Sequence, residues 1–367
     1  MQRLTSRHIR LNQPLPFDTY DSQGNLLLCK GYVVDRHTQI ETLIERGLFA
    51  VLEEDSPSSA SAESTAPEFN PFWLWDDILS KLLYLLKYAA KEELFSDKIC
   101  ALSHVVLNLA DTDPDAALAA ILLKDASRYP YAHSLHVAIL AAIISRRLGW
   151  SDPIRLEVIH AALTMNVAMI ELQTALLFQR EPLTEEQRFE VNLHPKKGVQ
   201  ILSLKSVSNP EWLDAVRLHH ERLPLVDGMI AHPDGRSLSQ LIRVLDIFCA
   251  KISPRAYRQA MQPPVAAREI FVQEREACGT LVEALIKEIG LYMPGSFVRL
   301  VNDETAVVVK RGAALNTPRV ASLTRADGMP FLEAAKRDTA RPEFAIKSVV
   351  PREKVIHTLN LSRLWGY

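Results

Sequence analysis

The chain has 367 residues, of which 48% are apolar and 23% are charged. It is long enough for two or three domains with buried cores, and its composition excludes a disordered polypeptide. Lys and Arg number 42 and Asp and Glu 44, which gives a formal net charge of −2. The chain therefore lacks the basic excess that DNA or RNA as a main partner would require.

Neither a membrane span nor a secreted protein is expected. The longest uninterrupted apolar run, residues 137–144, is far shorter than the ~20 residues that cross a bilayer. The first residues contain no apolar signal-peptide core. The cysteines Cys29, Cys100, Cys249 and Cys278 are scattered and form no CxxC pair. This usage is typical of reduced thiols, so we expect a cytoplasmic protein.

Residues 1–55 predict a small α+β module. A turn at 21–24 precedes a short apolar strand at 26–29, and apolar residues spaced i, i+3, i+4 predict a helix over 38–46. Residues 56–70 hold five serines, two prolines and no Lys or Arg, which predicts a flexible linker. We predict that the module is an interaction or sensing domain tethered by this linker.

Residues 71–290 predict a helical bundle, and residues 291–367 a β-rich C-terminal extension. One helix begins at Asp152, and Thr184 with Gln187 forms a capping box before another. The stretch 137–148 is apolar on most sides, as is typical of a central helix. Residues 297–301 and 306–309 predict a β-hairpin, followed by strands at 320–323 and 345–350. The predicted fold class is mainly α.

The histidines of the helical region are the candidate functional residues. They occur as His133 with His136, as His194, and as His219 with His220, and Asp246 follows them. Imidazole and carboxylate suit Fe, Mn, Zn or Ni, and a bundle can direct them into one cavity. In the alternative without a metal, His133 and His136 share a solvated helix face and His194 lies near a helix start. Adjacent His219 and His220 point about 100° apart on a helix, so one is expected to be buried and one exposed.

The order of these motifs over residues 131–295 resembles the HD-GYP family, a branch of the HD phosphohydrolases. The matching segments are HSLHV at 133–137, LTEE at 183–186, HPKKG at 194–198, HHER at 219–222, Asp246 with RAYR at 255–258, and GLYMPGS at 290–296. The resemblance implies an HD-type helical bundle that hydrolyses cyclic di-GMP at a centre of two or three metals. It implies that His194, His219 and His220 bind one metal and that His133 and Asp246 bind another. It also implies that Arg255 and Arg258 contact ligand phosphates.

The chain departs from the family at its chemical centre. Met165 and Asn166 replace the His-Asp pair, Met169 replaces a phosphate-binding Lys, Tyr129 replaces a Glu, and the GYP segment is absent after residue 222. A thioether and a neutral amide cannot supply the negative charge that holds two dications close together. We therefore expect no normal catalytic residues, and either no metal or a single Fe, Mn, Zn or Ni ion on vestigial ligands.

Two functions follow from the resemblance and its departures. The first is a catalytically inactive regulatory or binding protein of bacterial cyclic di-GMP signalling, which binds the dinucleotide or a signalling protein. Arg243, Lys251 and Arg268 make the stretch around Arg255 and Arg258 basic, which favours phosphate binding. The alternative is a weak metal-dependent cyclic di-GMP phosphodiesterase that uses the three-His site. A structural adaptor without a ligand is a third reading, and the oligomeric state is left open.

Overall fold

The computed structural model describes residues 69–124, 128–225, 229–254, 259–355 and 359–367, together with four short strands near the N-terminus. The chain divides into two units, Met1–Glu68 and Phe69–Tyr367. In the first unit, β1 (Gln2–Arg3), β2 (Thr19–Tyr20), β3 (Leu26–Leu28) and β4 (Phe49–Ala50) form an antiparallel sheet in the order β1-β4-β2-β3. The strand predicted at 26–29 is present. The helix predicted over 38–46, and the linker apart from residues 69 and 70, lie outside the described residues.

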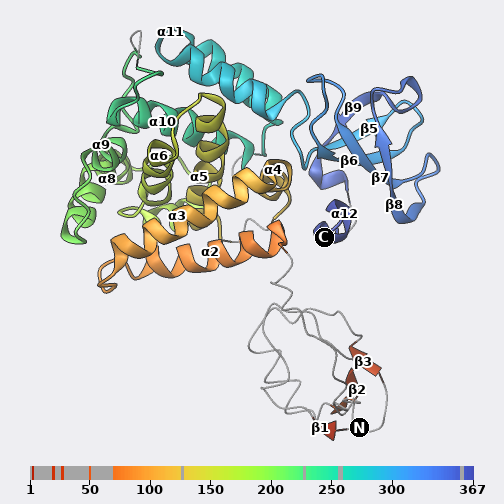
Figure 1. Cartoon of the computed structure of the whole chain (residues 1–367), viewed down its shortest axis with the longest axis horizontal. Coiled ribbons are helices and arrows are strands. Elements are labelled where there is room, and N and C mark those ends of the chain that lie inside the picture. The colour runs from red at the N-terminus through yellow and green to blue at the C-terminus, as the bar shows by residue number, and fades with distance from the viewer. Residues whose placement is uncertain are drawn as a thin grey trace, which may run out of the picture. The chain divides into compact units, whose positions relative to one another are not determined.

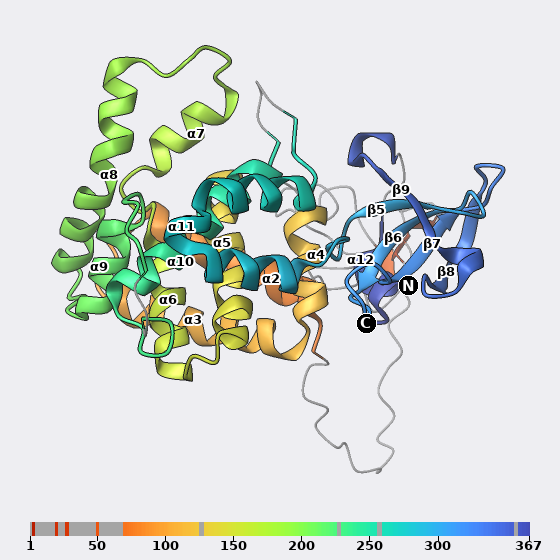
Figure 2. The same ribbon diagram turned by 90° about the horizontal axis from the view of Figure 1, so that it is seen from above.

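The second unit begins with helices α2 (Pro71–Lys87), α3 (Phe95–Thr112), α4 (Pro114–Leu123), α5 (Tyr129–Arg147), α6 (Asp152–Thr164), α7 (Ile170–Phe178), α8 (Glu185–Leu204), α9 (Pro210–Leu218), α10 (Gly235–Ile252) and α11 (Pro263–Ile289). Helix α5 runs through the middle of this bundle and contacts α2, α3, α4, α6, α7, α10 and α11 (Figures 1 and 2). The predicted mainly α fold is confirmed.

Helix α5 is buried on every side, as its apolar sequence predicted. All residues from 132 to 145 are buried. His133 and His136 therefore lie in the interior, and the alternative that placed them on a solvated helix face is wrong, because neighbouring helices cover the whole circumference of α5. Within the described residues, no helix combines the length and the apolar character that crossing a membrane would require.

Helix α8 starts at the predicted capping box. The Thr184 hydroxyl accepts a hydrogen bond from the Gln187 backbone N–H at 3.2 Å, and the Gln187 side chain accepts one from the Thr184 N–H at 3.0 Å. His194 lies in the interior of this helix, so the alternative that placed it near a helix start is wrong. The helix continues through Pro195, and this continuation determines how His194 is held.

The C-terminal part is a five-stranded antiparallel sheet followed by one short helix. Strands β5 (Phe297–Leu300), β6 (Thr305–Lys310), β7 (Arg319–Thr324), β8 (Pro330–Asp338) and β9 (Ile346–Val350) pair in the order β8-β7-β6-β5-β9. Two 3₁₀ turns, at Pro342–Phe344 and Arg352–Lys354, flank β9, and α12 (Leu361–Trp365) ends the fold. The predicted hairpin is β5–β6, and the predicted strands at 320–323 and 345–350 are β7 and β9.

Ion pairs attach this sheet to the bundle, and a hydrogen bond attaches the chain end to it. Arg311, directly after β6, pairs with Asp115 of α4 and with Glu288 of α11. At the chain end, the Tyr367 hydroxyl donates a hydrogen bond to Asp113 at 2.6 Å. The sheet, α12 and the bundle therefore meet at a junction built from residues that are far apart in the sequence (Figure 1).

Candidate metal centre and the cavity beside it

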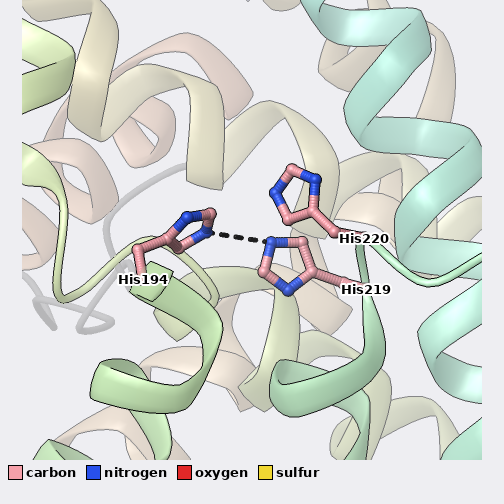
Figure 3. Close-up of side chains that lie close together, drawn as sticks. All are labelled: His194, His219 and His220. Atoms are coloured by element: carbon pink, nitrogen blue, oxygen red, sulfur yellow. Dashed lines mark hydrogen bonds between the residues drawn. The ribbon is translucent and has the colours of Figure 1, made fainter. Parts of the chain in front are cut away.

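Three histidines from α8 and from the end of α9 face one another (Figure 3). One ring nitrogen from each of His194, His219 and His220 lies within 4.8 Å of the other two. The Nε2 atoms of His194 and His219 are 3.2 Å apart. His219 is buried and His220 is exposed, which confirms the prediction for this adjacent pair.

The backbone fixes the tautomers of the two buried histidines. Pro195 has no N–H for the Val191 carbonyl four residues earlier, and the His194 Nδ1 lies 2.6 Å from that carbonyl oxygen. The His219 Nδ1 lies 2.7 Å from the Val216 carbonyl oxygen, in the last turn of α9, where helix carbonyls lack helical partners. Because a carbonyl only accepts, each Nδ1 carries the proton and donates it. Both Nε2 atoms therefore present lone pairs.

Facing lone pairs of this kind fit a divalent cation. Burial lowers the pKa of His219 to about 3 and that of His194 to about 4, and the neighbouring His220 lowers both pKa values further. Both rings are therefore neutral near pH 7, the form that binds metals. Two nitrogens bound to one tetrahedral ion, each about 2.0–2.1 Å from it, are about 3.3 Å apart. The observed spacing of 3.2 Å is close to this value.

His133 and Asp246 form a second group, between α5 and α10. The His133 Nε2 lies 2.6 Å from an Asp246 oxygen, and its Nδ1 lies 3.2 Å from the Tyr129 hydroxyl. Burial raises the pKa of Asp246, but the hydrogen bond from His133 and the nearby histidines outweigh burial and hold that pKa well below its usual range. The two predicted ligands of a second metal are thus hydrogen-bonded to each other.

A cavity of 480 Å³ adjoins both groups. Its wall includes Tyr129, His133, His220 and Asp246, with residues of α7 and of the loop before α8 on the opposite side. Two of its wall residues, Gln173 and Arg180, have no counterpart among the predicted site residues. Their sequence surroundings carry no motif, and only the position of α7 brings them to the cavity.

The two residues that replace the family's His-Asp pair lie in different surroundings. Met165 is fully buried in the hydrophobic core, whereas Asn166 is 4% exposed and lines the cavity. Met169, at the start of α7, lines it too. Within the described chain, the Asn166 side-chain amide has no hydrogen-bond partner, and the buried Gln173 Oε1 in the same wall has none. The cavity therefore offers neutral amide groups at the position of the expected carboxylate.

The predicted phosphate ligands Arg255 and Arg258 lie outside the described residues, so their role stays a prediction. Two of the cationic side chains near them are already engaged in ion pairs within the protein. Arg243 pairs with Glu274 at 3.0 Å, and Lys251 pairs with Glu269 at 2.7 Å. Acidic residues of α11 therefore offset part of the positive charge of these two side chains, and Glu274 is shared between Arg243 and Arg222.

Replacing His219 with Ala is expected to weaken Zn²⁺ or Mn²⁺ binding by about 100-fold or more, since losing a ligand costs at least as much as the 10–100-fold typical of an outer-shell partner. Calorimetric titration of protein purified without an affinity tag measures this. His104→Ala, an exposed histidine on α3, is the matched control. Equal metal affinity in the natural chain and in His219→Ala would refute the three-His site.

Comparison with known proteins defines the class of this bundle. Residues 117–276 match the HD domain family. The structure also resembles Bd1817, an HDG"Y"P protein from Bdellovibrio bacteriovorus, with a TM-score of 0.51 and 13% identity over 78% of this chain and 98% of that one. The bundle is therefore an HD domain.

Two curated relatives narrow this class. Cyclic di-GMP phosphodiesterase PA4108 of Pseudomonas aeruginosa is 28% identical over 214 residues, which are 56% of this chain and 51% of the relative. The 3'3'-cGAMP-specific phosphodiesterase 3 of Vibrio cholerae is 30% identical over 141 residues, 37% of this chain and 30% of the relative. The chain thus spans about half the length of the first relative and less than a third of the second. The HD domain, the likeness to cyclic di-GMP phosphodiesterase PA4108 and the fold of an HDG"Y"P protein together make the chain similar to HD-GYP-like phosphohydrolases.

Proposed function

We propose that the chain is a regulatory protein of bacterial cyclic di-GMP signalling that binds the dinucleotide without hydrolysing it at a normal rate. The observation that carries this proposal is Asn166, whose side-chain amide lines the cavity and has no hydrogen-bond partner among the described residues, at the position where the family resemblance implies a carboxylate between two metals. Hydrolysis of a phosphodiester needs an activated water and a second Lewis acid beside the developing charge. A neutral amide does not hold two cations together, so turnover is lost on this proposal, and binding of the dinucleotide depends on the predicted phosphate ligands Arg255 and Arg258.

The three-His cluster favours a second candidate function, a weak metal-dependent phosphodiesterase. A divalent ion there would supply a Lewis acid and an activated water. The Nδ1 bonds of His194 and His219 keep both rings oriented, and their low pKa values keep both rings neutral. His133 and Asp246, hydrogen-bonded to each other at 2.6 Å, line the same cavity.

Incubation of the full chain with cyclic di-GMP and added Mn²⁺ or Fe²⁺ separates the two functions. We expect calorimetric binding and no linear dinucleotide product by chromatography, with 3'3'-cGAMP as a second probe. Turnover that His219→Ala abolishes and His104→Ala leaves intact would replace the first function by the second. An absence of binding heat for both dinucleotides would remove the nucleotide and leave a signalling protein as the partner.

The domain organisation is part of this proposal. Residues 1–55 serve as the sensing or docking module, residues 56–70 tether it, residues 71–290 hold the ligand, and residues 291–367 extend the bundle. The scattered cysteines, which form no CxxC pair, favour the cytoplasm.

A further inference from the structure

A second and larger cavity lies at the junction of the bundle and the C-terminal sheet. Its volume is 810 Å³, within the range of about 300–1,000 Å³ typical of ligand sites. Its lining residues come from the end of α3, the start of α4, strands β6, β7 and β8, and α12. Figure 1 shows where these elements lie in the fold. Bonds from Arg311 to Asp115 and from Tyr367 to Asp113 hold these walls together. We call this cavity the junction groove.

Four cationic side chains line the junction groove without an acidic partner. Lys310, Arg319, Lys336 and Arg341 make no side-chain hydrogen bond or ion pair within the described parts of the chain. Lys310 and Arg319 stand directly opposite each other in the β6–β7 ladder. Like charges at opposite ladder positions destabilise a sheet, so this pair costs stability that an anionic ligand would return.

The acidic residues of the junction groove are each engaged by the protein itself. The Asp113 side chain caps the start of α4 and accepts a hydrogen bond from the Tyr367 hydroxyl. Asp115 forms an ion pair with Arg311. Asp338 lies opposite Arg319 in the β7–β8 ladder, but it accepts the backbone N–H of Ala340 at 3.0 Å. The hydrogen bonds to Asp113 and Asp338 come from neutral donors and leave the charges of these two carboxylates in place. The four cations without an ion pair among the described residues outnumber them, so the net charge of the groove lining is positive.

Aromatic groups complete the lining. Trp365 packs edge-on against Phe72 at a centroid distance of 5.1 Å, and its indole N–H is buried without a hydrogen-bond partner among the described residues. The guanidinium carbon of Arg337 lies over the Phe344 ring, 4.7 Å from the ring centroid. The positive charge of Arg337 is balanced by an ion pair with Glu304 at 2.9 Å. A ligand in this groove thus meets flat rings, a free indole donor and unpaired cations together.

We propose that the junction groove is a second ligand site, for a nucleotide-class molecule that carries a phosphate next to a flat ring. Arg319 and Arg341 suit the phosphate because a guanidinium fork binds two phosphate oxygens at once. Lys310 and Lys336 add positive charge, and Trp365 and Phe344 suit the ring. The proposal is independent of the histidine centre, since none of these residues lines the cavity beside it.

Calorimetric titration of the full chain with GMP at low ionic strength tests the proposal, with inorganic pyrophosphate and guanosine as partial probes. We expect GMP to bind more tightly than either partial probe. The double variant Arg319→Gln, Arg341→Gln should lose at least tenfold in GMP affinity, and Trp365→Phe should lose a smaller factor. Lys347→Gln, on β9 at the opposite edge of the sheet, is the matched control and should bind GMP like the natural chain.

Three results would overturn the site. They are an absence of binding heat for both GMP and pyrophosphate, an unchanged GMP affinity in the double variant, and an equal loss in Lys347→Gln. A polyglutamate peptide that binds through Arg319 and Arg341 when GMP does not would replace the nucleotide by an acidic protein partner. All substituted residues except Trp365 are exposed, so circular dichroism melts like that of the natural chain are expected for these variants.

Discussion

The variant Asn166→Asp should bind Mn²⁺ at least about tenfold more tightly than the natural chain. The added carboxylate would face the cavity that His133, His220 and Asp246 line. At an effective dielectric constant of ~20, one added unit charge ~4 Å from a unit charge contributes ~4 kcal/mol before desolvation, and a factor of ten needs only ~1.4 kcal/mol. The exchange preserves side-chain shape, so packing changes little.

The same substitution should destabilise the metal-free protein. Asn166 is 4% exposed, so the new carboxylate would be buried near Asp246, which is ionised because its pKa is held low. Thermal melts after EDTA treatment should therefore fall, and added Mn²⁺ should restore them by more than it stabilises the natural chain.

Two control variants test whether the gain in Mn²⁺ affinity depends on a carboxylate at position 166. Asn166→Leu removes the amide without adding charge and should leave Mn²⁺ affinity unchanged. Gln173→Glu adds a carboxylate to the α7 wall of the same cavity and should gain less. Equal affinity in Asn166→Asp and the natural chain would mean that the lost charge at this position does not limit metal binding.

The sequence predicts a helix well where the helix is apolar on all sides or begins at a capping motif. Helix α5 is apolar all round and lies in the middle of the bundle, and the Thr184–Gln187 box sits at the start of α8. Strand β8 was missed because none of its residues is buried and its sequence shows no apolar alternation, and Leu332 within it is 98% exposed. A strand of this kind is defined by its partner β7 and not by its own pattern.

Long-range partners explain the rest of the difference. His194 before Pro195 looked like a helix start, because proline breaks the helical bond to residue 191, but the His194 ring takes up that carbonyl and the helix continues. The sequence showed Arg243 and Lys251 only as positive charges near Arg255 and Arg258, because their partners Glu274 and Glu269 lie on α11, which the fold brings alongside α10. The grouping of the histidines made them candidate ligands, their division between two metals came from the family resemblance, and the tautomers required the structure.

Replacing Arg311 with Ala is expected to lower the free energy of unfolding by about 3–5 kcal/mol, the range for removing one partner of a buried ion pair. Arg311 is the common partner of Asp115 and Glu288, whose side chains are each 11% exposed. Arg147 still pairs with Glu288 in the variant, so Asp115 carries most of the cost. Urea unfolding followed by circular dichroism measures the change.

The location of the loss is as informative as its size. Because Arg311 joins the sheet to α4 and α11, amide exchange in β5–β7 should quicken more than in α5. Lys347→Ala removes an exposed pair with Asp303 and should change stability by less than about 1 kcal/mol. Arg311→Met combined with Asp115→Leu should recover part of the loss, since the stranded charge is then absent. A loss below 1 kcal/mol for Arg311→Ala would mean that packing alone attaches the sheet to the bundle.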